Sequence, residues 1–556
     1  MKFKNILFFV ALSLCFSCND EFLEEVPVDF RAPENAYKTY QDFNLSVNNL
    51  YKLVRREFYS RDENYPMDYT YGTDLVFDGQ PSVRRWTPYI NVMRPQGGAE
   101  VPATHWQDLY KIVTESNTII SRLQKVELSA AEEIRVEAEA RFFRAFAYRT
   151  LAYLFGGVPL TLEEATEPKF DYVRATKEEV LAQCILDAKF AAENLRGITA
   201  VQNGEINNLA ASHLLTEIYL ANNQPQLAVE EANKVINDPN VRLMTARFGS
   251  QSTVDPGDVY WDLYRRNNQN RASGNTEGLW VIQFETDVLG GGSVSTGVGG
   301  SALYERHHAP MVRDYRLGGQ ALFKWPMSDY TGGRGIGWAV STRYFSNTIW
   351  ESDWSNDIRN ANHNFVREFT YNNPAFPQRF GTIVSTENPP AGITVPSRPF
   401  YAYQSKVTTP GDHPTGLYAN LQTGELKATA GGTYTDQYMF RLAETFLLRA
   451  EAHFKAGNAA AAADDINAVR RRANANPIAA GDVTIDYILD ERMRELGIEE
   501  KRRLTLQRLG LLYNRVTRFN PYYEGILEIN NLWPIPFSEI ERNTGAVLEQ
   551  NPGYEL

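Results

Sequence analysis

The residues that hydrolases and metalloenzymes use for chemistry are present in this chain, but they form no familiar catalytic pattern. Its 7 histidines are scattered. The nearest approach to a metal cluster is His307, His308, His363 and Asp314, in which adjacent histidines on a strand would face opposite ways. The sequence has no GxSxG, HExxH, Walker A or CxxC motif. The glycine-rich stretch 290–300 lacks the lysine of a phosphate cradle. We therefore predict no catalytic residue, no metal site and no cofactor, with only a role for calcium left open.

A second group of side chains is suited to binding. Aromatic residues make up 12% of the chain, with 30 Tyr and 9 Trp. Their rings combine an apolar face with a polar edge, which suits amphipathic ligands as well as core packing. The tract from Tyr59 to Pro102 has no helical period, and long irregular tracts that are ordered are usually functional. Within it stand Asp68, Asp74, Asp78, Arg84, Arg85, Trp86 and Tyr89.

A cysteine follows the apolar run at the start of the chain. Two lysines precede residues 6–16, and this run is too short to cross a bilayer but has the length of a signal peptide. Cys18 comes next and is followed by the acidic stretch NDEFLEE. The arrangement is typical of a bacterial lipoprotein signal, with Cys18 as the acylated first residue of the mature chain. Cys15 is the alternative, but Leu14 before it is too large for a lipobox.

Composition limits the class of protein. The chain has 556 residues, is 43% hydrophobic and carries a formal net charge of −12. It is long enough to bury a large core, and its negative charge argues against binding nucleic acid or gripping anionic lipid. Membrane attachment would therefore rest on the acyl chain. Once Cys15 is removed and Cys18 is lipidated, Cys184 is the last cysteine, so no disulfide is possible.

Helical segments must position these side chains. In EIRVEAEARFFRAFAYRTLAYLFGGVPL, apolar residues recur at three- and four-residue steps until the glycines at Gly156. This pattern predicts a long amphipathic helix that ends there. Thr176 and Glu179 then form a predicted capping box, in which each side chain satisfies a free backbone N–H at the start of the next helix.

An internal repeat indicates stacked helical hairpins. LLTEIYLANNQPQLAVEEANKVI (214–236) and LLRAEAHFKAGNAAAAADDINAVR (447–470) align as helix, polar turn and helix. This is the pattern of tetratricopeptide-like hairpins, which bury their faces by stacking. A third hairpin is expected within 138–195, and 38–56 with 107–125 could supply a fourth. Small residues are expected where paired helices approach closely, at Ala221, Ala228, Ala232, Ala450, Ala456 and Ala461.

The other kind of sequence fills residues 241–435. It is rich in Gly, Asn, Ser, Thr and Trp and has only short apolar runs. The predicted fold is therefore mainly α, a tetratricopeptide-like hairpin scaffold with a large irregular loop-rich region and a few short strands. The predicted parts are a signal peptide (1–17), a lipid-anchored tether (18–30), an N-terminal helical region (31–240) with a loop insert (59–102), an irregular ligand-binding region (241–435) and a C-terminal helical region (436–556).

Four stretches in order resemble one family. They are EAEARFFRAFAYRTLAYLFGGVPL, RLAETFLLRAEAHFKAGNAAAAADDINAVRRRAN, ILDERMRELGIEEKRRLTLQRLG and LWPIPFSEIERNTGAVLEQNPGY. With the lipobox before them, they are similar to the SusD/RagB family of Bacteroidetes outer-membrane lipoproteins, from Cys18 almost to the C-terminus. One departure is Ile498-Glu499-Glu500, where the family more often has Phe-Glu-Gly. Charges alternate with apolar residues in these stretches, so we expect buried ion pairs that join helices, through Glu491, Arg492, Glu495 and Arg502 among others.

The resemblance implies a function. Members of the family are tethered to the outer face of the outer membrane, and the acids after Cys18 resemble the signal for that location. They bind a glycan or another nutrient and deliver it to a SusC-type TonB-dependent transporter. They are not enzymes. Two alternatives stay open, because folding can bring any two acids together: a surface glycosidase, and a member that binds peptides or proteins.

The resemblance also suggests ligand contacts. A sugar ring needs a flat aromatic face, with carboxylates, amides or arginine at its edge. We expect Trp86 to be the stacking platform. Asp42 and Asn44, together with Asp68 and Trp86, look like the arrangement in fructan-binding members, which favours a fructan as ligand. The middle region contributes two further candidates, Arg367 and Tyr401.

Overall fold

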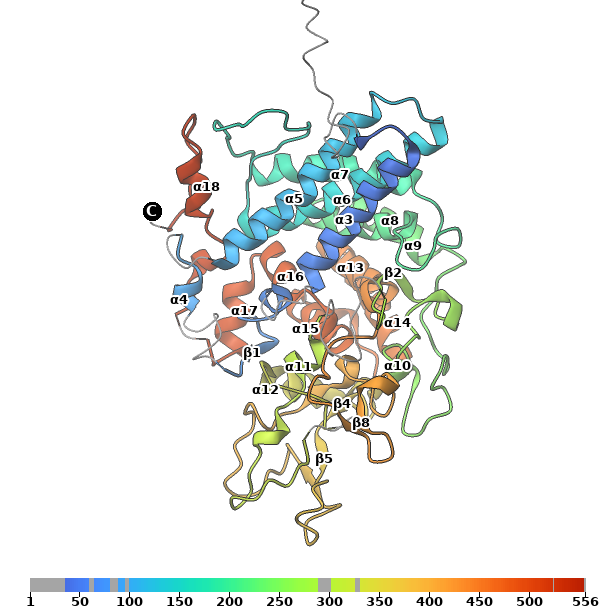
Figure 1. Ribbon diagram of the computed structural model, residues 1–556, viewed down its shortest axis with the longest axis vertical. Helices are drawn as coiled ribbons and strands as arrows, with labels where there is room; N and C mark the ends of the chain where they lie inside the picture. The colour runs from blue at the N-terminus through green and yellow to red at the C-terminus, as the bar shows by residue number, and fades with distance from the viewer. Residues whose placement is uncertain are drawn as a thin grey trace, which may run out of the picture.

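The computed structural model describes residues 36–59, 65–80, 89–95, 100–288, 302–325, 331–523 and 525–554. Cys18 and Trp86 lie outside these residues, so the lipid anchor and the stacking ring stay predictions. Figure 1 shows long helices gathered in one half of the molecule, and short strands with irregular chain in the other. The prediction of a mainly α fold with an irregular middle region is confirmed.

Long helices form the N-terminal half. α6 starts at a capping box in which the Ser129 hydroxyl accepts from the N–H of Glu132, and it ends where Gly156 adopts a φ of 75°. The box predicted at Thr176 and Glu179 begins α7. α6 packs between α5 and α7. The helices are α3 (Tyr40–Tyr59), α4 (Tyr89–Val92), α5 (Glu100–Leu123), α6 (Ala130–Phe155), α7 (Lys177–Asn194), α8 (Asn208–Ala221) and α9 (Pro225–Ile236).

The predicted repeat forms two hairpins that stack on each other. One is α8–α9 and the other is α13 (Leu442–Lys455) with α14 (Ala459–Arg472), and α9 packs against α13. Ala228, Ala232 and Ala450 are fully buried, as close approach requires. Ala456 is exposed at the end of α13, so the expectation of close packing there is wrong. The remaining C-terminal helices are α15 (Ile485–Glu495), α16 (Arg502–Arg508), α17 (Leu512–Phe519) and α18 (Phe537–Arg542).

Short elements make up the described part of the middle region. Its helices are α10 (Val259–Asp262), α11 (Tyr304–His308) and α12 (Arg343–Ser346). The described strands form antiparallel two-stranded ladders, β1–β3, β2–β10, β4–β7, β5–β6 and β8–β9. They are β1 (Val76–Asp78), β2 (Gly278–Ile282), β3 (Ala339–Ser341), β4 (Phe365–Val366), β5 (Glu368–Thr370), β6 (Ile383–Ser385), β7 (Tyr403–Gln404), β8 (Tyr418–Asn420), β9 (Glu425–Leu426) and β10 (Gln437–Arg441).

One hydrophobic core joins the N-terminal, middle and C-terminal regions. Its cluster of buried side chains extends from Phe43 to Leu548. Trp280 of β2 contacts Phe146 of α6 and Phe440 of β10, with ring centroids 5.5 and 5.6 Å away. β1 of the insert pairs with β3, which places Phe77 opposite Val340. The regions therefore depend on one another for burial of their apolar surface.

Buried ion pairs join the C-terminal helices to the rest of the chain, as predicted. Arg502 and Arg515 both bind Asp74 of the insert, at 2.7 and 2.8 Å. All three side chains are fully buried, so each charge depends on its partners for compensation. Further buried or partly buried pairs are Arg441 with Glu277, Glu495 and Glu499, Arg492 with Glu444 and Glu500, Arg359 with Glu491, and Arg508 with Glu451.

Candidate functional site

Three of the predicted ligand contacts are buried and have partners inside the protein. Asp68 is 0% exposed, and its carboxylate bonds His105 Nε2 at 3.0 Å. Arg367 donates to the carbonyl of Ser346 and to the Asn360 amide oxygen. The Tyr401 hydroxyl donates to the carbonyl of His308. Because their polar groups are engaged in the scaffold, these side chains are not presented to a ligand, contrary to the expectation.

The fructan-like grouping is not brought together either. Asp42 accepts from the N–H and hydroxyl of Thr39, at 2.9 and 2.8 Å, near the start of α3. Asp68 lies near the other end of that helix, because His105 bridges it to Glu57. At 1.5 Å per residue, Asp42 and Glu57 lie about 22 Å apart along the helix. Asn44 lines a separate cleft of about 580 Å³, between α3, residues 203–205 and β2.

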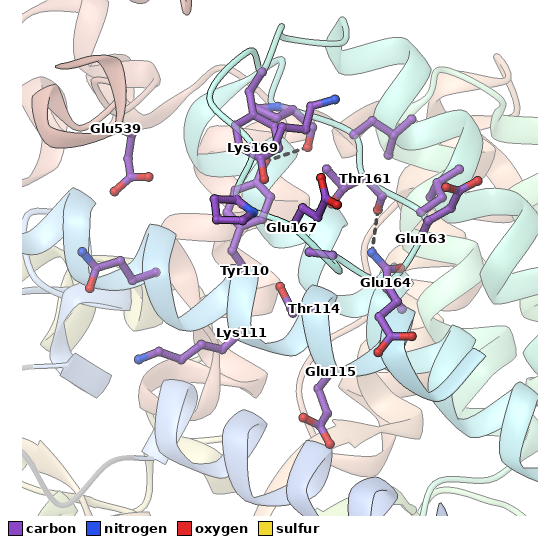
Figure 2. Close-up of a pocket in the computed structure, with 18 of the residues that line it drawn as sticks. Tyr110, Lys111, Thr114, Glu115, Thr161, Glu163, Glu164, Glu167, Lys169 and Glu539 are labelled. Atoms are coloured by element: carbon purple, nitrogen blue, oxygen red, sulfur yellow. Dashed lines mark hydrogen bonds between the residues drawn. The ribbon is translucent and has the colours of Figure 1, made fainter. Parts of the chain in front are cut away.

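A larger cleft lies on the other side of α3. It has a volume of about 1490 Å³ and is bounded by α5, by residues 159–172 and by α18. We call it the α5 groove. In Figure 2, Tyr110, Lys111 and Thr114 stand on α5, and Glu539 faces them from α18.

Residues 159–164 form one wall of the α5 groove, and hydrogen bonds hold them against α5 and α6. Tyr110 donates to the carbonyl of Pro159 at 2.7 Å. Asn117 and Tyr148 both donate to the carbonyl of Thr161, at 2.9 and 2.8 Å. Arg122 binds both carboxylate oxygens of Glu164 through its Nε and Nη2 nitrogens, which neutralises that acid. The segment after α6 is therefore held in place although it forms no helix or strand.

Residues 170–172 form another wall of the groove, and residues 543–545 near the C-terminus hold them in place. The N–H of Gly545 donates to the carbonyl of Phe170 at 2.6 Å. The Asn543 amide accepts from the N–H of Tyr172 and donates to its carbonyl. A β-carbon at position 545 would lie 3.0 Å from both the Phe170 carbonyl oxygen and the Asp171 β-carbon, so this close approach favours glycine. Residues 170–172 are thereby held as a rim.

An exposed aromatic ring and several polar side chains line the groove between these walls. Phe170 is 54% exposed. Exposed Gln107, Lys111 and Thr114 line the helix side. Exposed carboxylates stand opposite, at Glu163 and Glu167.

Glu115 is one of the partly buried acids of the groove. Burial raises the pKa of Glu115, although hydrogen bonds with Asn49 and Ser46 oppose the shift. The groove therefore has a hydrogen-bonded, partly buried acid within its wall and exposed carboxylates at Glu163 and Glu167. An apolar ring face next to acceptors and donors is the chemistry that hydroxyl-rich ligands require.

Among the described residues, no group of three or more His, Cys, Asp and Glu side chains could hold a metal ion. Within the same residues, none of the helices is long and apolar enough to cross a membrane.

Sequence reasoning missed the α5 groove. Its two walls come from positions such as Tyr110, Thr161 and Gly545, which share no periodic pattern. One signal was available: the stop at Gly156 is followed by LTLEEATEPKFDY, a polar stretch with no helical or strand period. Such a stretch between two strong helices predicts an exposed loop, and exposed loops often carry binding residues.

Comparison with known proteins establishes the family. Residues 276–554 match a family model described as "SusD family", and residues 31–220 match one described as "Starch-binding associating with outer membrane". The chain belongs to the SusD family.

Among its relatives, a SusD-like protein of Formosa agariphila is 24% identical over 100% of both chains. The starch-binding protein SusD of Bacteroides thetaiotaomicron is 36% identical over 23% of this chain and 24% of its own length.

Solved structures share the fold. A laminarin-binding SusD-like protein has a TM-score of 0.66 and 22% identity, covering 93% of this chain and 100% of its own. Surface glycan-binding protein A of Bacteroides thetaiotaomicron, solved with laminarihexaose, also has a TM-score of 0.66, with 17% identity, and covers 92% of this chain and 99% of its own.

Proposed function

We propose that this protein is a cell-surface glycan-binding lipoprotein that captures an oligosaccharide or polysaccharide and delivers it to a SusC-type TonB-dependent transporter. The observation that supports this proposal most is the α5 groove, in which an exposed aromatic ring lies with carboxylates, an amide and a hydroxyl. The chain that forms this groove belongs to the SusD family. It acts as a binding protein and not as an enzyme. An acyl chain on Cys18 holds it at the outer membrane.

The groove suits a saccharide better than a purely apolar ligand. Phe170 can cover the C–H face of a sugar ring, while Glu163, Glu167 and Thr114 lie within the same groove to bond its hydroxyls. Fold relatives that bind laminarin and laminarihexaose support the saccharide class.

The more specific part of the proposal is that the glycan is a fructan. Of the grouping that suggested a fructan, only Asp42 and Asn44 still support it among the described residues, since Asp68 is buried at the opposite end of α3. The ligand panel should therefore include fructans, laminarin and starch on equal terms.

Calorimetry with levan, inulin, laminarin and starch tests the proposal. We expect at least one glycan to bind, and Phe170→Ala and Glu167→Gln each to weaken its binding about tenfold. Phe380→Ala is the matched control, because Phe380 is 57% exposed but lies outside the groove. Unchanged affinity in both groove variants would exclude this groove as the site. Absence of any glycan binding would refute the proposed function.

Separate measurements test the other parts of the proposal. A β-barrel transporter is expected to co-purify with the protein from outer membranes, and Cys18→Ala is expected to release the protein from the cell surface. Turnover of any glycan in the panel would favour the surface glycosidase instead.

A further inference from the structure

Two stacked ring pairs lie where the insert, the middle region and the C-terminal region meet. Phe77 of β1 stacks on Tyr522 with centroids 3.7 Å apart and planes at 18°. Tyr344 of α12 stacks on Phe519 of α17 at 3.8 Å and 22°. In Figure 1, β1 and α12 lie near one end of α17. This face is separate from the α5 groove.

The ring of Tyr522 is both accessible and fixed. Phe77 is 9% exposed whereas Tyr522 is 39% exposed. Since Phe77 covers one face of the Tyr522 ring, the exposed part is the opposite face and the edge. A ring that is already held in place loses little conformational entropy when a ligand stacks on it.

The backbone beneath Tyr522 is held by a buried amide. Asn520 is 1% exposed, and its nitrogen donates to the carbonyls of Thr73 and Val76 at 2.6 and 3.1 Å. Its oxygen accepts from the N–H of Tyr522 at 3.3 Å. The turn that carries Tyr522 is thus tied to the insert strand on which Phe77 lies.

An exposed arginine, Arg343, lies on the same face as this ring, next to the insert strand β1 whose Phe77 stacks on Tyr522. Arg343 is the first residue of α12, and the preceding Thr342 bonds the backbone of Leu75 and Asp74. Burial raises the pKa of Tyr522 and the charge of Arg343 lowers it, so the two groups are electrostatically coupled.

The neighbouring arginines are already neutralised by acids, but Arg343 is not. Arg515 and Arg518 are paired with acids that include Asp486, at 2.9 and 2.8 Å. Within the described part of the chain, Arg343 forms no ion pair with an acid. Among the described residues, Arg343 therefore offers an unpaired cation on the same face as a fixed aromatic ring.

We propose that Tyr522 and Arg343 form a subsite for a negatively charged sugar residue, one that carries a carboxylate or a sulfate group. Tyr522 stacks on the C–H face of the sugar ring, and the planar Arg343 fork pairs with its anionic group. The inference rests on the proposed function, because it assumes that the protein binds glycans. It adds a second contact surface and a preference for anionic glycans.

Binding of alginate, a carboxylated glycan, and carrageenan, a sulfated one, tests the subsite, with laminarin and inulin as neutral comparisons. We expect wild type to bind at least one anionic glycan, with affinity that falls as salt rises. Arg343→Gln should weaken that binding about tenfold and leave neutral glycans unaffected. Arg379→Gln is the matched control, since Arg379 is an exposed arginine outside the face.

A second pair of variants tests the ring. Tyr522→Phe should preserve binding of the anionic glycan, and Tyr522→Ala should weaken it, with circular dichroism to verify that both variants fold. The inference is overturned if wild type binds no anionic glycan, or if Arg343→Gln binds it as well as wild type does. It is also overturned if these variants lose only the transporter, because the face would then dock a protein. Neutral-glycan binding that depends on Phe170 would still support the proposed function in each case.

Discussion

Replacing Asp74 by Asn should destabilise the protein more than most carboxylate changes would. Burial raises the pKa of Asp74, but attraction to Arg502 and Arg515 outweighs it and holds the pKa well below its usual range. Breaking a buried ion pair by removing one partner costs about 3–5 kcal/mol. Each arginine keeps another acid, since Arg502 is 3.1 Å from Glu500 and Arg515 is 2.6 Å from Asp490. We therefore expect the lower end, about 3 kcal/mol.

Denaturant unfolding followed by circular dichroism measures this difference, and Asp486→Asn is the matched control. Asp486 also pairs with Arg515, but its side chain is 43% exposed, so its loss should cost about 1 kcal/mol or less. The contribution of Asp74 is present above about pH 4, its ordinary pKa, and is lost as pH falls further. Equal and small losses in both variants would refute the argument that burial makes the Asp74 pairs important.

Three further outcomes are expected. Burial lowers the pKa of His105, but Glu57 and Asp68 raise it to about 9. The contribution of protonated His105 to the stability of the fold is therefore complete below about pH 6.5, its ordinary pKa, and is lost as pH rises through 9. Relative to His105→Gln, wild type should lose about 3 kcal/mol of unfolding free energy over that interval, and equal pH profiles would contradict this. Burial raises the pKa of the Cys184 thiol, so its labelling by a thiol reagent should follow global unfolding; fast labelling of the folded protein would be inconsistent. Thr176→Ala should cost about 1 kcal/mol in a denaturant titration through loss of the helix cap, with Thr114→Ala on the surface of α5 as control.

Local physics made much of the scaffold predictable. The periodicity of α6, its stop at Gly156 and the box at Thr176 follow from rules that act within a few residues. The pairing of β1 with β3 does not, since it joins three-residue strands at Val76 and Ser341 that carry no periodic signal. Long-range pairing of such short strands is decided by tertiary packing.

The candidate ligand residues were harder to predict, because the same side-chain types serve ligands and interiors. Asp68 stands in a loop-rich tract, yet its partner is His105 from α5. Arg367 likewise binds backbone carbonyls in the middle region. The sequence shows that a charged group needs a partner, but only the fold shows whether that partner belongs to the protein.

The ties between the insert and the C-terminal helices have a consequence for the order of folding. Asp74 and Arg502 are 428 positions apart in the chain, and the N–H of Trp533 donates to the carbonyl of Leu154 at the end of α6. A nascent chain that ends after the N-terminal helices lacks both arginines that compensate Asp74 in the complete fold. We therefore expect the N-terminal helices to become stable only after the C-terminal helices have been synthesised. Truncation near the C-terminus should then destabilise the N-terminal helices as severely as the C-terminal ones.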